Sequence, residues 1–452
     1  MRRIWPALLA LFGFAFITAA ILIPTVLVSQ LRVVPLDLDI TSDATTVSAD
    51  GGTGDRFPAV VLDRCSLSEQ RARQLDAHLT QQRRSVIIDP SSKTRATVQS
   101  AQTVRIDRVR DADGNETDLS FAAIGEQRTC NDGLLSATID RVSVNRKTSV
   151  PDGKVHSIQF DALPEGGNLE DVSVDVPRQG FQYKFGFNVQ KRPYLYFDSN
   201  TRTDNPAEFV GETTIKGLKV YEFVSEVPET DLSELPNPQG EAALGTMLSQ
   251  PASWWGITGT GIRPTDSVTM HRYAKATRHV FVEPTTGTIV DGKEDQEQYY
   301  RSPDQSESMP AAIRDYKLHA LKGTFKWADS TVARQVDKAD HYKGLLTLAK
   351  VWLPLILGII GALLILAWLW LFLRSRRAEA DGPSDDGSAY DYEAPAAAGS
   401  WSAPAQSSPD SSTTVLPRDD APTAGVGPWD RPTEQIPHLD EGDGPDDPLR
   451  KR

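Results

Sequence analysis

The stretch IWPALLALFGFAFITAAILIPTVLVSQL, which spans Ile4–Leu31, is apolar and contains no charged residue. A second uncharged apolar stretch, VWLPLILGIIGALLILAWLWLFL, spans Val351–Leu373. About 20 helical residues cross a hydrocarbon core of roughly 30 Å, so each stretch is long enough to span a membrane. Because a helix satisfies its own backbone hydrogen bonds in lipid, both stretches are predicted to be transmembrane helices.

Basic residues flank the two stretches on the sides that face the chain termini. Arg2 and Arg3 precede the first stretch, and Arg374, Arg376 and Arg377 follow the second. The positive-inside rule then places both flanks in the cytoplasm. We therefore expect a two-pass plasma-membrane protein with both termini in the cytoplasm and the intervening domain outside. The alternative for the first stretch is a cleaved signal peptide, whose apolar region is usually about 7–15 residues long.

Composition divides the chain into four expected parts: an N-terminal anchor at 1–31, an extracytoplasmic domain at 32–344, a second transmembrane helix with its basic stop at 345–377, and a tail at 378–452. The tail has 16 acidic and 5 basic residues, so it carries −11 of the net charge of −13. Its few apolar side chains cannot offset the entropy of ordering, so it is predicted to be disordered. The chain has no basic patch, and nucleic acid is not an expected partner.

The pattern of apolar, polar and turn residues in the large middle segment predicts antiparallel strands. Thr103–Val109 and Ala137–Val144 alternate apolar and polar residues, as half-buried strands do. Lys-Gly pairs are predicted to turn the chain into hairpins within Phe209–Val227 and Tyr316–Ala328, and a Pro-Thr-Thr-Gly turn does the same within His279–Val290. The expected fold is α+β: a β-rich antiparallel domain anchored by one transmembrane helix at each end, with a disordered C-terminal tail.

Two helices are predicted inside this domain. Ser66–Glu69 has the pattern of a capping box, so a helix is expected over Gln70–Gln82. A second helix, from Asp329 or Ser330 toward His341, would lead the chain back to the membrane.

Small residues also occur four apart in both anchors, at Ala15 and Ala19 and at Gly358 and Ala362. This spacing lets helices approach closely in lipid, which predicts that the anchors pack together. The alternative is that these small residues face lipid.

Cys65 and Cys130 are the two cysteines of the chain, and both lie in the segment expected outside the membrane. Because disulfides persist in oxidising space, we predict that they are bonded to each other. Two buried free thiols are the alternative.

The sequence contains no complete metal-binding or catalytic motif. Asp111–Asp118 has oxygen ligands spaced like the start of a calcium loop, but Gly114 is at the fourth position and Ala122 at the twelfth, so a turn is favoured. The histidines have no zinc-like spacing, and no nucleophile elbow is present. We expect no enzyme, no cofactor and no metal site. Trp254 and Trp255 could contact lipid or a ligand, but packing in a core is the commoner fate.

Two threonines of the tail share a pattern, with an aliphatic residue three positions later and then proline: Thr433 with Ile436, and Thr413 with Leu416. Phosphothreonine followed by such a residue resembles the preference of forkhead-associated domains. Thr433, with Thr413 second, is therefore a candidate phosphorylation site for a phosphothreonine-binding partner. An acidic tail with incidental threonines is the alternative.

Six segments carry a family resemblance: Arg32–Asp39, Asp63–Ser66, Lys191–Asp198, Gly217–Phe223, Val282–Val290 and Thr331–Val336. Together they resemble the PorA-named family of actinobacterial membrane proteins, over roughly residues 1–375. The family name implies a porin. A transmembrane barrel needs many strands with an outward apolar band, whereas this sequence offers two apolar helices and a polar loop.

A looser, architectural resemblance is to the class B scavenger receptors, which implies the passage of lipid through a tunnel in a domain between two anchors. The expected function is that of a non-enzymatic cell-envelope protein whose extracytoplasmic domain binds or conveys an envelope component such as lipid. A pore-forming protein and a scaffold that signals through its tail are the alternatives. An apolar cavity in the domain would favour lipid binding. A continuous polar channel through an oligomer would favour a pore, and a solid core would favour a scaffold.

Overall fold

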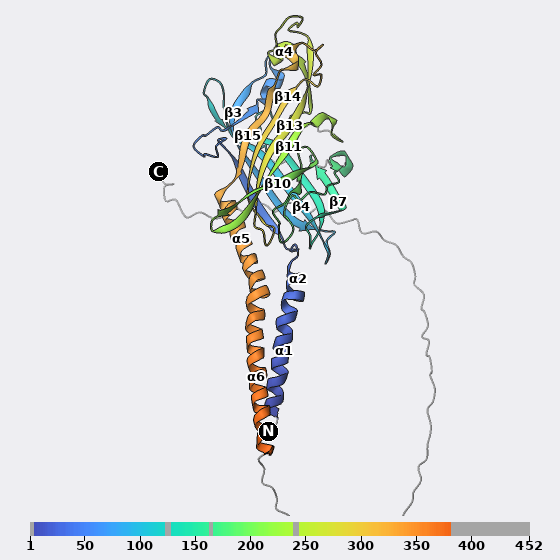
Figure 1. Cartoon of the computed structure of the whole chain (residues 1–452). Coiled ribbons are helices and arrows are strands. Elements are labelled where there is room, and N and C mark those ends of the chain that lie inside the picture. The colour runs from blue at the N-terminus through green and yellow to red at the C-terminus, as the bar shows by residue number, and fades with distance from the viewer. Residues whose placement is uncertain (1–3, 123–127, 162–165, 238–243, 381–452) are drawn as a thin grey trace, which may run out of the picture. The chain divides into compact units, whose positions relative to one another are not determined.

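The computed structural model describes residues 4–122, 128–161, 166–237 and 244–380, all within one compact unit. Its centre is an antiparallel sheet, from one end of which the two membrane helices extend (Figure 1). The strands are β1 Asp39–Val47, β2 Ala59–Leu62, β3 Gln74–Ile88, β4 Arg95–Arg110, β5 Glu116–Asp118, β6 Leu134–Asn145, β7 Pro151–Gln159, β8 Ser173–Asp175, β9 Tyr194–Asp198, β10 Thr203–Ile215, β11 Leu218–Asp231, β12 Met247–Pro251, β13 Ser267–Val282, β14 Ile289–Arg301 and β15 Leu318–Trp327.

The sheet runs in the order β8-β7-β6-β4-β3-β1-β15-β14-β13-β11-β10-β9, while β2, β5 and β12 pair beside this path. The sheet curls so that its two edge regions lie close together. This is shown by Phe197 of β9, which packs in one cluster with Ile158 of β7 and Val174 of β8. The inner face of the curl is thereby enclosed. The described part of the chain confirms the predicted β-rich antiparallel domain with helices at both ends.

The first membrane helix comprises α1 Ile4–Leu22, the π-helical turn η1 Ile23–Leu27 and α2 Val28–Leu31. The second comprises α5 Asp329–Thr347, the π-helical turn η5 Leu348–Trp352 and α6 Leu353–Ala380. Both are long and apolar enough to cross a membrane. Large apolar side chains point outward along them, with Trp5 70% and Leu363 61% exposed, which water would penalise and lipid favours. The predicted helix after Asp329 is confirmed, and it continues directly into the membrane helix.

Small residues let the two membrane helices pack against each other in antiparallel fashion. A Cβ atom added to Gly13 would lie 3.1 Å from the Gly361 carbonyl oxygen, and one added to Gly361 would lie 2.9 Å from the Gly13 carbonyl oxygen. Nearer the sheet, Gly358 faces Ala20. The predicted contact between the anchors is present, with Gly13 tightly packed against Gly361 and with Gly358 facing Ala20 rather than Ala15.

The expected helix at Gln70–Gln82 is wrong. Residues Arg64–Ser68 form only a short 3-10 helix, η2, and β3 follows from Gln74. Within β3 the buried residues are Ala77, Leu79 and Ser85, and all three lie at alternate positions on one face of the strand. This period of two outweighs the capping-box pattern, because it lets one face of a strand join the core.

Of the two predicted Lys-Gly turns, one is correct. Lys216 and Gly217 both have positive φ and connect β10 to β11 as a tight hairpin. Lys322 and Gly323 instead lie inside the single strand β15. A Cβ at Gly323 would lie 2.9 Å from the Cβ of Ala59, so this glycine allows close approach of β2 rather than a turn. The hairpin between β13 and β14 is present.

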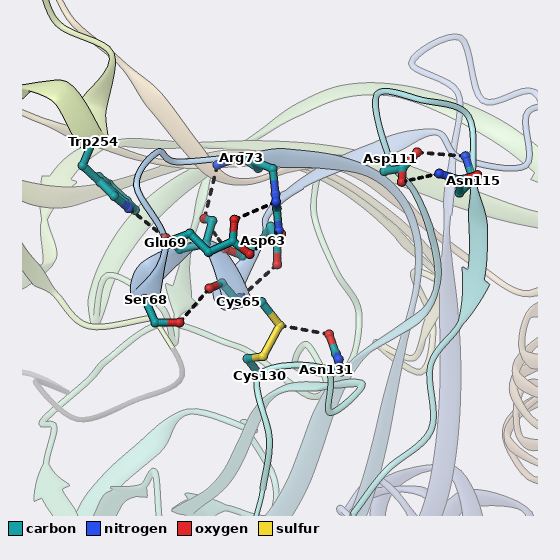
Figure 2. Close-up of polar contacts among 11 residues, drawn as sticks. Asp63, Cys65, Ser68, Glu69, Arg73, Asp111, Asn115, Cys130, Asn131 and Trp254 are labelled. Atoms are coloured by element: carbon teal, nitrogen blue, oxygen red, sulfur yellow. Dashed lines mark hydrogen bonds and ion pairs between the residues drawn. A yellow bond between two sulfur atoms is a disulfide. The ribbon is translucent and has the colours of Figure 1, made fainter.

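The disulfide between Cys65 and Cys130 joins η2 to the segment before β6, with the Cα atoms 4.9 Å apart (Figure 2). Arg73 donates to Asp63 at 2.7 Å and to Glu69 at 2.8 Å beside it, and the Trp254 indole donates to the Ser66 carbonyl at 2.8 Å. The bond therefore secures the loops at the end of the sheet that holds α3 Ala252–Trp255 and α4 Ala311–Arg314.

Candidate functional site

The side chains on the inner face of the sheet change character along each strand. In β13, alternate residues face inward, in the order Val268, Met270, Arg272, Ala274, Ala276, Arg278, Val280 and Val282. The apolar residues at the two ends belong to packed clusters, whereas the arginines face a cavity. Two small residues, Ala274 and Ala276, lie between the arginines at the inward positions. The interior is thus packed at both ends of this strand and open along its middle.

A larger, mainly apolar cavity of about 350 Å³ lies where the membrane helices join the sheet. We call it the apolar chamber. Its walls come from the segment after α2, from β1, β4 and β6, and from α5, and they include Val34, Pro35, Leu38, Ile40, Val98, Val142, Val144 and Tyr342. Its volume is at the lower end of the range found for small-molecule pockets, about 300–1,000 Å³.

The two membrane helices themselves hold this end of the domain together. The Tyr342 hydroxyl on α5 donates to the Leu31 carbonyl at the end of α2. Val28 packs against Leu346 and Ala349 just below. Because α5 also contributes Tyr342 to the wall of the apolar chamber, the chamber lies beside the ends of the two apolar helices that are nearest the sheet.

A second cavity, of about 120 Å³, lies deeper in the domain between the strands β3, β4 and β6 on one side and β13 and β14 on the other. We call it the polar chamber, because its lining includes Gln81, Gln102, Thr138, Arg272, Gln296 and Gln298. Gln182 and Tyr183 line both chambers, so a single layer of side chains separates them.

That layer is fixed by a buried ion pair. Arg178 donates to the two carboxylate oxygens of Asp140 at 2.6 and 2.8 Å, and the Tyr183 hydroxyl donates to the same carboxylate. The side chains of Arg178 and Asp140 are only 1% and 6% exposed. Burial, reinforced by the Asp140 charge, holds the pKa of Tyr183 well above its usual value, so the phenol stays protonated as a donor.

Arg278 forms a second buried ion pair on the wall of the polar chamber. Its guanidinium lies 2.5 Å from an Asp198 oxygen and 2.9 Å from a Glu294 oxygen. Burial lowers the pKa of Arg278, but these two carboxylates outweigh it, so the pKa is raised overall. Arg278 is therefore a fixed and neutralised charge.

Lys184 lies at the apolar chamber without a carboxylate in ion-pair distance among the residues that the structure describes. Its ammonium donates to the carbonyls of Phe185 and Thr286 and lies 3.9 Å from the centre of the Phe187 ring. Burial lowers its pKa to about 7, an effect that Glu283 only partly opposes. The chamber thus contains a lysine whose charge changes near neutral pH.

The structure places the candidates taken from the sequence away from these chambers. Cys65 and Cys130 are bonded to each other. Asp111 forms a turn in which its carboxylate accepts from the Asn115 amide (Figure 2). Trp254 and Trp255 are core residues, 2% and 3% exposed. No group of three metal-ligating side chains lies close together within the described ranges.

The candidate phosphorylation sites, Thr413 and Thr433, lie outside the described residues. The sequence reading missed both chambers, although the inward series of β13, with two arginines around two alanines, is visible in the sequence.

Comparison with known proteins gives a consistent match along the chain. The model of a family described as Porin PorA matches residues 5–370. A protein of Corynebacterium amycolatum named Porin PorA is 30% identical over 388 residues, which cover 80% of this chain and 96% of that protein. Another protein of that name, from Corynebacterium resistens, is 28% identical over 432 residues, which cover 84% of this chain and 98% of that protein.

Proposed function

We propose that this chain, which belongs to the Porin PorA family, is a non-enzymatic envelope protein whose β-rich domain takes up the hydrocarbon chain of a membrane lipid in the apolar chamber. The observation that carries the proposal is the position of this chamber. It is mainly apolar, has a volume of about 350 Å³, and is walled in part by the helix that continues into the membrane. An acyl chain that enters it exchanges one apolar environment for another without crossing water.

Photo-crosslinking tests this proposal directly. The full chain in lipid nanodiscs is mixed with a phospholipid that carries a diazirine on its acyl chain, illuminated and mapped by mass spectrometry. We expect label on the chamber wall, at Val34–Ile40, Val98 and Val142–Val144, in addition to the membrane helices. Label confined to α1 and α6 contradicts the proposal.

A pair of variants sharpens this test. Val142 is 2% exposed and faces the chamber, whereas Val210 on β10 is 54% exposed. Val142→Trp fills the chamber and should remove label from its wall, while Val210→Trp adds the same bulk outside and should leave the labelling unchanged. Equal labelling of the two variants contradicts uptake into the chamber.

Pore formation is the second candidate, favoured by the name Porin PorA that the two relatives carry. In this chain the outer face of the sheet carries exposed polar side chains on β3, at Gln82 and Arg84. A pore would therefore be built by association of several copies rather than by this sheet in lipid. Stepwise ionic conductance in a planar bilayer that contains the full chain, unchanged in Val142→Trp, would favour the pore over lipid uptake.

We also propose the orientation that the flanking arginines predict, with the β-rich domain outside the plasma membrane. Fluorescent-protein fusion after Arg377 should be fluorescent in the cytoplasm, and alkaline phosphatase inserted at Lys216-Gly217 should be active. The reverse pattern contradicts this orientation. The tail would then be cytoplasmic, where Thr433 and Thr413 remain predicted sites for a phosphothreonine-binding partner. Phosphopeptide mapping of membranes tests this prediction.

A further inference from the structure

Arg272 is a buried guanidinium with no partner among the residues that the structure describes. It is 8% exposed and faces the polar chamber from β13. Its Nε has no hydrogen-bond partner, and no carboxylate lies within ion-pair distance in the described ranges. Arginine does not lose its proton in proteins, so the charge cannot be relieved by neutralisation. A buried charge of this kind is costly unless a partner balances it.

Arg278 shows what a balanced arginine looks like on the same strand. It faces inward six residues later and contacts Asp198 and Glu294 at 2.5 and 2.9 Å. Arg272 instead lies opposite Tyr300 in the strand pairing, and the Tyr300 hydroxyl donates to the Gly245 carbonyl. The sheet therefore supplies carboxylates to one arginine of this pair and none to the other.

The charged groups around the polar chamber also include more cations than anions. Its charged lining residues and their ion-pair partners are the cations Arg178, Arg202, Arg272 and Arg278 and the anions Asp140, Asp198 and Glu294. Four guanidinium groups thus face three carboxylates. Arg202 donates to the backbone carbonyls of Pro236 and Asn237, which carry no net charge. Among the described residues, Arg202 and Arg272 are therefore both without a carboxylate, and this set of groups carries a net charge of +1.

The chamber has room and neutral hydrogen-bonding groups beside Arg272. Ala274 and Ala276 follow Arg272 at the next two inward positions of β13 and carry no polar side chain. Gln296 and Gln298 lie opposite these alanines on β14 and line the same cavity of about 120 Å³. An anion placed here would meet a charged fork and amide donors together.

We propose that the polar chamber binds an oxyanion, a phosphate or carboxylate group, through Arg272. The planar guanidinium matches both groups, which accept two parallel hydrogen bonds from it. The anion is either free or the headgroup of an amphiphile whose chain lies in the adjoining apolar chamber. The site itself rests on the charge of Arg272 and holds whether or not the apolar chamber takes up lipid.

Thermal unfolding of the full chain in detergent micelles tests the site, with inorganic phosphate or acetate compared against chloride at equal ionic strength. We expect the unfolding midpoint of the wild type to rise saturably with phosphate or acetate. Arg272→Gln should unfold no earlier than wild type in chloride, because it removes an unpaired charge. Its apparent affinity for the anion should be at least about tenfold weaker, the loss of one charged hydrogen-bonding partner.

A second variant keeps Arg272 and supplies the missing anion from the protein. Gln298 lies diagonally across from Arg272 in the strand pairing, within reach of a long side chain. Gln298→Glu should raise the midpoint in chloride and abolish the response to phosphate and acetate. Gln70→Glu makes the same change at an exposed position and should respond like wild type.

A short-chain lipid distinguishes the two possible sources of the anion, a free anion and a lipid headgroup. A headgroup is indicated if dihexanoyl phosphatidate acts at lower concentration than phosphate and Val142→Trp removes that advantage. A free anion is indicated if phosphate acts equally well and Val142→Trp changes nothing. The proposal is overturned if wild type responds to neither anion, or if Arg272→Gln and Gln298→Glu respond as wild type does.

Discussion

Removal of Asp140 should destabilise the β-rich domain far more than removal of an exposed carboxylate in an equally short ion pair. The Asp140 carboxylate accepts two hydrogen bonds from Arg178, at 2.6 and 2.8 Å, and one from Tyr183. Asp140→Ala leaves the guanidinium, only 1% exposed, without an anion. Breaking a buried pair in this way costs about 3–5 kcal/mol of the free energy of unfolding.

The matched control is Asp39→Ala, which removes the partner of Arg84. That pair has a distance of 2.8 Å, but its side chains are 56% and 53% exposed, so its loss should cost about 0–1 kcal/mol. Urea unfolding of the full chain in detergent, followed by tryptophan fluorescence, measures both costs. The double variant Asp140→Leu/Arg178→Leu should recover much of the loss, because it removes both buried charges. Equal costs for the two single variants would refute this reasoning.

Three other outcomes are expected. Cys65→Ser should lower the free energy of unfolding by about 2–5 kcal/mol relative to the oxidised wild type, and no change after reduction of the wild type would contradict this. A chain with Ala20→Cys and Gly358→Cys should form a crosslink between the membrane helices, because the Cβ position at Gly358 lies 3.9 Å from the Ala20 Cβ; absence of a crosslink under mild oxidation would argue against the packing. The Lys184 pKa is lowered from 10.5 to about 7, so the unfolded chain binds more protons between these values and stability should rise with pH across this window. Lys184→Met should flatten that rise in pH-dependent urea unfolding, and an unchanged slope would contradict the assignment.

The sequence was sufficient for the parts of the fold that depend on strong, continuous patterns. Two long uncharged apolar stretches have few alternatives to membrane helices, and the helix from Asp329 carries the domain into the second of them. The hairpin at Lys216-Gly217 was also predictable, since Gly217, which is suited to positive φ, lies between two alternating segments. In each of these cases the local preference agrees with the tertiary structure.

Local patterns failed where tertiary contacts decide the conformation. The polar residues of Gln70–Gln82 suit a helix, but the alternation around Ala77 and Leu79 is buried between β1, β2 and β4. Gly323 looks like a turn residue until Ala59 is seen to pack against it. The chambers were not predictable for a similar reason, because Val142, Tyr342 and Arg272 come from strands and a helix that meet only in the folded chain.

One continuous helical rod, Asp329–Arg377, serves both as a wall of the apolar chamber and as a membrane span. At about 1.5 Å per residue, its 49 residues extend for roughly 74 Å. A helix of fixed apolar length tilts when the bilayer becomes thinner. Since Tyr342 lies on the same rod as Gly361, such a tilt displaces the chamber wall together with the span. We therefore expect the thickness of the surrounding bilayer to influence the position of this chamber wall.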